Sequence, residues 1–303
     1  MKQQTLLRVE QLFSVRGKHV LLTGGGRGIG KMMATGLVAN GAHVAIASRD
    51  EAALAGAVEE LNSVGAGGSC IALAANLGTR AGCEKLASDY AAALGESASC
   101  DVLINNSGAS WGEPLERMSG KMNWGWDRVL DLNVKGPFYL TRAMRPLLSA
   151  ASKLADDGPM QSTVGAAADP ARVINIGSIA GILPQDVPTH AYDVSKAALH
   201  HLTKKMAADL SRPDAAYGPR AITVNAIAPG FVPTKMSQGL ATWGADMQAL
   251  AANVPLGRCG TDADMAAVAI FLSSPASAWM TGAIIPVDGG ATGAACVPVL
   301  PDE

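Results

Sequence analysis

This 303-residue sequence has no large excess of charge of either sign. Its formal net charge is −2, so it lacks both the basic surface typical of nucleic-acid-binding proteins and a polybasic membrane patch. No apolar run approaches the length that a bilayer-spanning helix needs. We therefore expect neither a nucleic acid nor a membrane among its partners.

Cysteine pairs and targeting signals are also missing. The five cysteines are an odd number and none forms a C-x-x-C pair, which favours free thiols in a reducing compartment. The N-terminal stretch MKQQTLLRVEQLFSVRGKHV lacks the uninterrupted apolar segment and the cleavage site of a secretory signal. No histidine spacing indicates zinc ligands. We expect a cytoplasmic protein without a bound metal.

The sequence does contain ample material for a core, with 49% apolar and 17% charged residues. Short apolar runs at 19–23, 43–48, 70–75, 101–105, 172–177, 222–228 and 283–287 alternate with helical patterns such as 29–40 and 50–62. This alternation predicts an α/β fold in which helices cover both faces of a doubly wound parallel sheet. No internal repeat or change of composition marks a second domain, so we expect one domain with about seven strands. The Gly- and Ala-rich stretch 156–171 is expected to be a surface loop.

A glycine-rich turn follows the first predicted strand. The stretch TGGGRGIG (23–30) fits G-x-x-x-G-x-G through Gly24, Gly28 and Gly30. Glycines allow a tight turn and close backbone approach, and the N-terminus of the following helix attracts a pyrophosphate. A glycine loop can also be merely flexible, but its place between a strand and a helix favours dinucleotide binding.

The end of the second predicted strand predicts which dinucleotide is bound. NAD-binding proteins keep an acid there for the ribose hydroxyls, whereas this chain has Ser48 followed by Arg49. A guanidinium suits a 2′-phosphate, and Arg27 in the glycine turn supplies a second one. Asp50 is expected to cap the next helix. The sequence therefore favours NADP(H).

The stretch HAYDVSKAALHH (190–201) places Tyr192 one helical turn before Lys196. Either the tyrosine packs and the lysine faces solvent, or the two form one acid–base unit. An ammonium about 4 Å from the phenol, at an effective dielectric constant near 20, supplies about 4 kcal/mol. That energy would lower the phenol pKa by about three units, so we expect Lys196 to lower the pKa of Tyr192.

Together, the glycine turn and Y-x-x-x-K resemble the short-chain dehydrogenase/reductase family, whose fold is Rossmann-like. Further motifs of that family follow in the same order: NNSG (105–108), LNVKGPF with Asn133, INIGSIAG with Ser178, and APGFVPT (228–234). The resemblance covers residues 14–290. It leaves 1–13 as an N-terminal extension and 291–303 as a C-terminal tail.

The resemblance implies a role for each of these polar residues. Tyr192 would be the general acid in carbonyl reduction, or the base in the reverse reaction, and Lys196 would also hold the nicotinamide ribose. Ser178 would bind the substrate oxygen, Asn133 would hold a water in a proton relay, and Thr234 would bind the nicotinamide carboxamide. Considered singly, Ser178 and Thr234 could be helix caps and Asn133 could satisfy backbone groups.

The cofactor contacts implied by the resemblance come from several motifs. Asn76 stands where most members have an aspartate, and its amide oxygen can still accept a hydrogen bond. Ser107 and Val194 replace two common alanines, and the Ser107 hydroxyl would need a neighbouring backbone partner. The expected contacts are Gly24, Arg27, Gly28, Ile29, Gly30, Ser48, Arg49, Asn76, Leu77, Asn105, Ser107, Gly108, Tyr192, Lys196, Pro229, Gly230, Val232 and Thr234.

The substrate is expected to lie among loops at 109–116, 182–188 and 235–255. No Lys/Arg cluster there indicates a small anion, so the pocket favours an apolar or extended ketone. Some of the candidate side chains could equally serve core packing. The candidates are Trp111, Gln185, Val187, His190, Met236 and Trp243.

Longer stretches, such as SGASWGEPLE and YGPRAITVNAIAPGFVPTKM, resemble 3-oxoacyl thioester reductases, particularly the subgroup linked with rhamnolipid synthesis. This similarity implies NADPH-dependent reduction of such a thioester, or of a related ketone, to a secondary alcohol. One alternative is an NADP-dependent dehydrogenase of a polyol, sugar or cyclic alcohol. Another is a non-catalytic NADP-binding regulatory protein, although such a protein would usually have lost Tyr192 or Lys196. Members of the family commonly form homo-oligomers, which implies a dimer or a tetramer.

Overall fold

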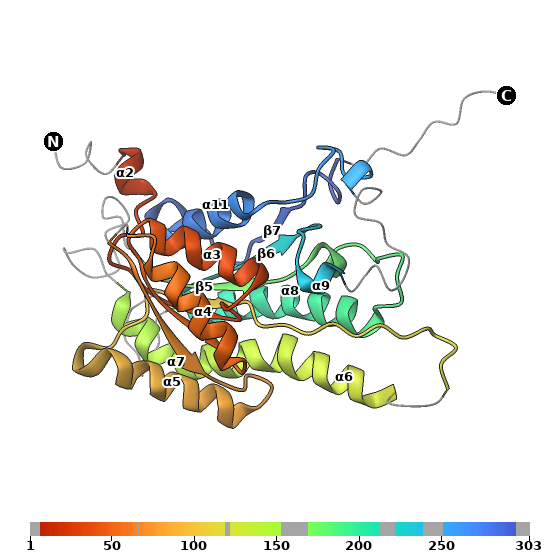
Figure 1. Ribbon diagram of the computed structural model, residues 1–303, viewed down its shortest axis with the longest axis horizontal. Coiled ribbons are helices and arrows are strands. Elements are labelled where there is room, and N and C mark those ends of the chain that lie inside the picture. The colour runs from red at the N-terminus through yellow and green to blue at the C-terminus, as the bar shows by residue number, and fades with distance from the viewer. Residues whose placement is uncertain are drawn as a thin grey trace.

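The computed structural model describes residues 7–65, 67–118, 122–152, 169–212, 222–238 and 251–294. A parallel seven-stranded sheet in the order β3-β2-β1-β4-β5-β6-β7 forms its centre (Figure 1). The order reverses between β1 and β4, which creates the kind of switch point where open α/β sheets bind ligands. The strands are β1 His19–Thr23, β2 His43–Ser48, β3 Ser69–Ala74, β4 Val102–Asn105, β5 Ala171–Ile176, β6 Ile222–Pro229 and β7 Ile284–Val287.

Every predicted strand is confirmed, with its bounds within one residue of the observed ones. The runs are apolar throughout because both faces of the sheet are covered. In β1, Val20 and Leu22 belong to one hydrophobic cluster, whereas Leu21 between them belongs to the other. The loop predicted at 156–171 lies largely outside the described residues.

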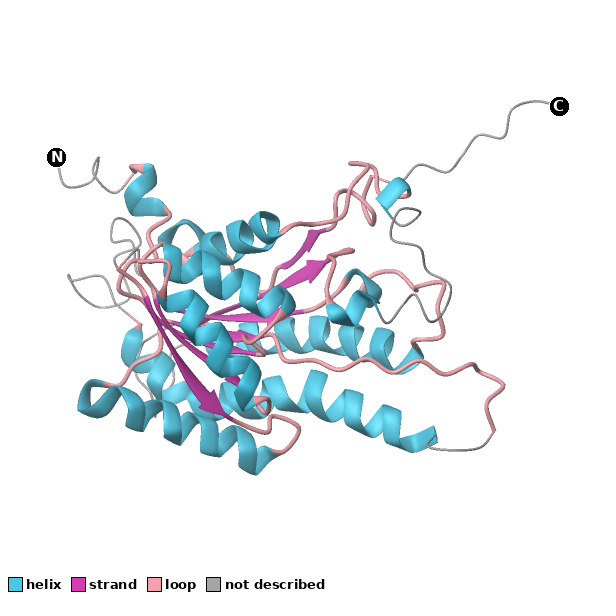
Figure 2. Ribbon diagram, viewed as in Figure 1, coloured by secondary structure: helices cyan, strands magenta, loops and turns pink. Residues whose placement is uncertain are grey.

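Helices cover both faces (Figure 2). The helices α3 (Gly28–Ala39), α4 (Glu51–Asn62) and α11 (Asp262–Ser273) pack on one face, and α5 (Arg80–Leu94), α7 (Gly136–Ala151) and α8 (His190–Leu210) pack on the other. No helix in these described ranges has both the length and the apolar character needed to cross a membrane. The shorter elements are α2 Val9–Leu12, η1 Gly95–Ser97, α6 Met122–Leu130, the π-helical η2 Asp131–Lys135, η3 Ile179–Gly181, α9 Lys235–Gln238 and η5 Pro275–Ser277.

A buried ionic cluster lies at the amino-terminal edge of the sheet. Arg172 at the start of β5 is 1% exposed. It pairs with Asp169 at 2.7 Å and donates to the backbone carbonyl of Ser274, just beyond α11. Lys18, just before β1, also pairs with Asp169 at 2.7 Å. The cluster therefore ties the starts of β1 and β5 to the end of α11, at the opposite end of the strands from the predicted site.

Candidate active site

The glycine turn forms a bare backbone cradle between β1 and α3. Gly24 and Gly28 have φ values of +71° and +55°, in the left-handed region that favours glycine. Gly30 has no room for a side chain, because a Cβ there would lie 2.2 Å from the Gly24 carbonyl oxygen. Ile29 packs against the core. This cradle precedes a 12-residue helix, so it fits the pyrophosphate of a dinucleotide.

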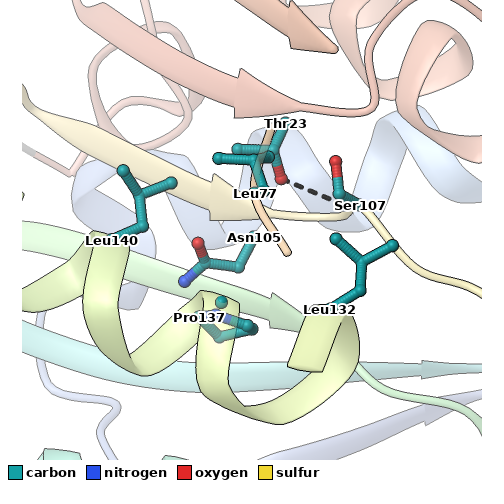
Figure 3. Close-up of a pocket in the computed structure, with 8 residues that line it drawn as sticks. Thr23, Leu77, Asn105, Ser107, Leu132, Pro137 and Leu140 are labelled. Carbon is teal, nitrogen blue, oxygen red and sulfur yellow. Dashed lines mark hydrogen bonds between the residues drawn. The ribbon is translucent and has the colours of Figure 1, made fainter. Parts of the chain in front are cut away.

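Two residues that the sequence analysis did not single out hold this turn against the end of β4. The Thr23 hydroxyl accepts hydrogen bonds from the backbone N–H groups of Asn106 (2.9 Å) and Ser107 (3.0 Å) (Figure 3). The Asn106 amide donates to the carbonyls of Thr23 (2.9 Å) and Gly24 (3.2 Å). In the sequence, the second asparagine of NNSG was the feature that could have predicted this contact.

Some predicted cofactor contacts have their side chains directed into the protein. Asn105 is buried and donates to Asn175 at 2.9 Å, and Leu77 is buried in the core beneath α5 and α7. Both line a small recess together with Ser107 (Figure 3). The Ser107 hydroxyl was expected to have a backbone partner, but it has none within the described ranges. It is only half-buried, so solvent or a ligand can satisfy it instead.

Two exposed arginines lie near the end of β2. Arg27 is 66% exposed and approaches Asp50 at 3.5 Å, and Arg49 is exposed directly after Ser48. Asp50 accepts a hydrogen bond from the backbone of Ala53 at 3.1 Å, which confirms the predicted cap of α4. The region thus offers two available guanidinium groups, as a 2′-phosphate requires.

The remaining adenine-side candidate, Asn76, is exposed. Its amide oxygen accepts a hydrogen bond from the backbone N–H of Gly78 at 3.2 Å, so this oxygen stabilises the turn at residues 76–78.

Three of the four predicted catalytic side chains lie together where β5 ends beside α8. Lys196 is 4% exposed. Its Nζ lies 5.5 Å from the ring centroid of Tyr192 and donates to the Ile176 carbonyl at 2.7 Å. The Ser178 hydroxyl caps η3 by accepting from the backbone of Ala180 at 3.1 Å. It also hydrogen-bonds the Tyr192 phenol.

The expected lowering of the tyrosine pKa is wrong for this structure. Burial raises the pKa of Tyr192, the hydrogen bond from Ser178 opposes that rise, and the nearby charge of Asp193 adds to it. Burial also lowers the pKa of Lys196 to about 8. Removing both groups from water therefore outweighs their mutual attraction. Tyr192 consequently keeps its proton at neutral pH.

Asn133 lies in the π-helical η2 and is 1% exposed; π-helical turns occur frequently at functional sites. Its amide oxygen accepts from the Ala109 backbone N–H at 2.8 Å, and its nitrogen donates to the Ala109 carbonyl and to the Ser195 hydroxyl, both at 2.9 Å. A Cβ on Gly108 would lie 3.4 Å from the Asn133 oxygen and 3.8 Å from Lys196 Nζ. The side chain of Asn133 therefore makes structural bonds close to Lys196. Its oxygen, which accepts one hydrogen bond, keeps a second acceptor position, so the water relay stays a prediction.

The turn after β6 lies against the glycine cradle. Thr234 caps α9 by accepting from the backbone of Ser237 at 3.2 Å, and a Cβ on Gly28 would lie 3.4 Å from Thr234 Cγ2. Val232 is buried. A Cβ on Gly230 would lie 2.8 Å from the Cα of Asp288, just after β7, so Gly230 also has no room for a side chain. The turn is therefore close enough to contact a dinucleotide in the cradle.

The predicted substrate residues fall into two connected loops. Trp111 donates through its indole N–H to Glu113 at 3.2 Å, and its ring packs tightly on Gly125 of α6. The backbone N–H of Glu113 donates to the Pro188 carbonyl at 2.8 Å, which links the two loops. Among the other candidates, Gln185 and Val187 are half-buried and His190 is exposed at the start of α8; the side chain of Met236 and the residue Trp243 lie outside the described residues.

No group of His, Cys, Asp or Glu side chains within the described ranges is arranged to hold a metal ion. The site consists of a phosphate cradle, a tyrosine that holds a proton, a buried lysine and a serine hydroxyl. This arrangement can bind a dinucleotide and donate a proton to a carbonyl oxygen beside it.

Comparisons with known proteins agree with this geometry. A family model described as "Enoyl-(Acyl carrier protein) reductase" matches residues 24–292. The chain is 42% identical to the rhamnolipids biosynthesis 3-oxoacyl-[acyl-carrier-protein] reductase of Pseudomonas aeruginosa, over 92% of this chain and 97% of that protein. It is 31% identical to the L-tagatose-forming galactitol 2-dehydrogenase of Cereibacter sphaeroides, over 93% and 97%. The solved Pseudomonas aeruginosa RhlG/NADP active-site complex has a TM-score of 0.76 and 40% identity, covering 93% of this chain and 98% of that one.

Proposed function

The chain belongs to the short-chain dehydrogenase/reductase family, and we propose that it is an NADPH-dependent ketoreductase. Its substrate is a 3-oxoacyl thioester or a related ketone, and its product is a secondary alcohol. The observation that carries this proposal is the half-buried Tyr192 next to the buried Lys196, with Ser178 beside them, at the edge of the sheet where the phosphate cradle lies.

The residues divide the chemistry among themselves. Bound NADPH supplies a hydride for the carbonyl carbon. Ser178 hydrogen-bonds the carbonyl oxygen and stabilises the negative charge that develops there. Tyr192 gives its proton to that oxygen, and Lys196 orients the nicotinamide ribose and passes a proton back to the tyrosine. The raised pKa of Tyr192 means that the phenol carries the proton that the reduction requires.

The cofactor is NADP(H), and the chain offers groups for each of its parts. The backbone from Gly24 to Gly30 and the N-terminus of α3 hold the pyrophosphate. Arg27 and Arg49 hold the 2′-phosphate, and Thr234 binds the carboxamide. The open glycine cradle and the exposed guanidinium groups support this assignment. The solved Pseudomonas aeruginosa RhlG structure, which is 40% identical to this chain, is an NADP complex.

The thioester substrate is supported by the 42% identity to a 3-oxoacyl-[acyl-carrier-protein] reductase. The second candidate is a dehydrogenase of a polyol, sugar or cyclic alcohol, which the 31% identity to a galactitol 2-dehydrogenase favours. Both reactions would use the same tyrosine, lysine and serine, so the substrate loops decide between them.

The test is the rate of NADPH oxidation over a ketone panel, with NADH in parallel. The panel contains an acetoacetyl thioester, a longer 3-oxoacyl thioester, a diketone and a keto-sugar. We expect the fastest turnover with a 3-oxoacyl thioester and NADPH. Turnover confined to the keto-sugar would replace the thioester by the second candidate. No turnover, with NADPH still bound, would overturn the enzymatic proposal and support a regulatory NADP-binding protein.

The proposal also covers the setting in which the enzyme acts. We place the catalytic domain at residues 14–290 and the protein in the cytoplasm as a homo-oligomer, either a dimer or a tetramer. The edge strand β7 supports assembly because it ends the sheet and its residues Ile284 and Ile285 are only half-buried. Size-exclusion chromatography with light scattering tests the assembly, and a monomer at working concentration would refute it.

A further inference from the structure

Asp193, which directly follows the proposed catalytic tyrosine, has both carboxylate oxygens occupied by the segment that precedes it. The backbone N–H of Gln185 donates to Asp193 Oδ2 at 3.1 Å. The Thr189 hydroxyl donates to Asp193 Oδ1 at 2.9 Å. In return, the backbone N–H of Asp193 donates to the Thr189 carbonyl at 3.0 Å. One carboxylate thus fixes two points of the chain four and eight residues away.

The segment held in this way, residues 182–189, borders the site. It follows β5 and η3 at the carboxyl edge of the sheet, where ligands of open α/β sheets bind. Its Pro188 carbonyl accepts the backbone N–H of Glu113 from the loop that carries Trp111. A shift of residues 182–189 would therefore be transmitted to the second loop at the site.

Asp193 directly follows Tyr192 in α8, and its negative charge adds to the rise in the pKa of Tyr192 that burial causes. Its hydrogen bonds to Gln185 and Thr189 tie the loop to the helix that carries the tyrosine.

We propose that Asp193 is a positioning residue that holds the substrate loop 182–189 against α8. The inference rests on the proposed ketoreductase function. It goes beyond that function by assigning the fit of the substrate to one side chain outside the catalytic group.

Three variants test this role. Asp193→Asn removes the charge and makes one of the two acceptor positions a donor. Thr189→Val removes the hydroxyl that bonds Asp193 at 2.9 Å and the Val187 carbonyl at 3.5 Å, and the Thr189 side chain makes no capping bond to α8 that would be lost. Asp186→Asn is the matched control, because Asp186 is exposed in the same loop and has no hydrogen-bond or ion-pair partner within the described residues.

Each variant is compared with wild type by kcat and KM for thioester reduction. Asp193→Asn should raise the ketone KM about tenfold through the loop, with little change in kcat. Thr189→Val should raise KM less, because the hydrogen bond from Gln185 to Asp193 remains, and Asp186→Asn should change neither constant.

Amide hydrogen exchange of residues 182–190 gives a readout that needs no substrate. Exchange should accelerate in Asp193→Asn and Thr189→Val but not in Asp186→Asn. The inference is overturned if Asp193→Asn matches Asp186→Asn in KM and in exchange. A wild-type protein that reduces no ketone would instead refute the proposed function, and exchange would still test the loop contact.

Discussion

Replacing Lys196 by methionine should make the cofactor-free protein more stable while abolishing its activity. Lys196 is 4% exposed, and its Nζ donates a hydrogen bond to the Ile176 carbonyl at 2.7 Å. Burying the Lys196 charge therefore lowers the free energy of unfolding, although catalysis needs this lysine. Methionine has a similar length without a charge, and it is readily accommodated in apolar surroundings.

The size of this effect follows from the pKa of the lysine. Burial lowers the pKa of Lys196 from its ordinary 10.5 to about 8. At about 1.4 kcal/mol per pKa unit, this gap corresponds to about 3 kcal/mol of destabilisation at neutral pH. Loss of the hydrogen bond to Ile176 should cost about 1–2 kcal/mol. We therefore expect Lys196→Met to raise the free energy of unfolding by about 1–2 kcal/mol.

The pH dependence identifies the cause. The folded-state pKa of Lys196 is lower than the unfolded one, so the unfolded chain binds its proton more tightly and wild-type stability rises between about pH 8 and pH 10.5. The gain in unfolding free energy from Lys196→Met should therefore be largest below about pH 8 and should disappear by about pH 10.5.

Urea unfolding of cofactor-free wild type and Lys196→Met across this pH range, at one protein concentration, measures the difference. Lys204→Met is the control, because Lys204 is an exposed lysine of the same helix. It should change stability by less than about 0.5 kcal/mol. A Lys196→Met protein less stable than wild type at neutral pH would refute the reasoning, as would an advantage that does not shrink as the pH rises.

Three further changes test other parts of the account. Arg49→Ala should reduce the preference for NADPH over NADH about 10- to 100-fold in kcat/KM, because it removes a charge-assisted bond to the 2′-phosphate; an unchanged ratio would exclude Arg49 from that role. Gly177→Ala should lower kcat at least about tenfold because its Cβ would lie 2.2 Å from Nε2 of the buried His200, and adding His200→Ala should restore part of the loss. Arg172→Met should lower the unfolding free energy in urea by about 3 kcal/mol, because it leaves Asp169 without one of its two buried partners; an equally stable variant would show that the pair is dispensable.

Most of the fold could be predicted because hydrophobic pattern and turn chemistry agree along the chain. A parallel strand covered on both faces is mostly apolar, so each of the seven strands was visible as a short run rich in apolar residues. The helices that follow β1 and β2 were predicted for a similar reason, since a glycine turn or an aspartate cap precedes each of them. The fold and the glycine cradle therefore followed from local sequence.

The parts of the site that could not be predicted depend on tertiary burial. The spacing of Tyr192 and Lys196 indicated that they meet, but the direction of the tyrosine pKa depends on how completely the fold excludes water from both. The Asn133 amide also bonds a loop 24 residues away, a structural contact that the motif did not predict. Thr23 and Asn106 are joined across 83 residues, a contact that no local pattern reports.

The most direct test of the central claim compares wild type with Tyr192→Phe. Reduction of an acetoacetyl thioester by NADPH is followed with both proteins, and NADPH binding is measured separately by fluorescence. We expect wild type to form one 3-hydroxyacyl product per NADPH oxidised. Tyr192→Phe should bind NADPH equally well but reduce the ketone at least about a hundredfold more slowly, because it has no proton to give. Near-normal turnover by Tyr192→Phe would show that another group donates the proton and would contradict the account.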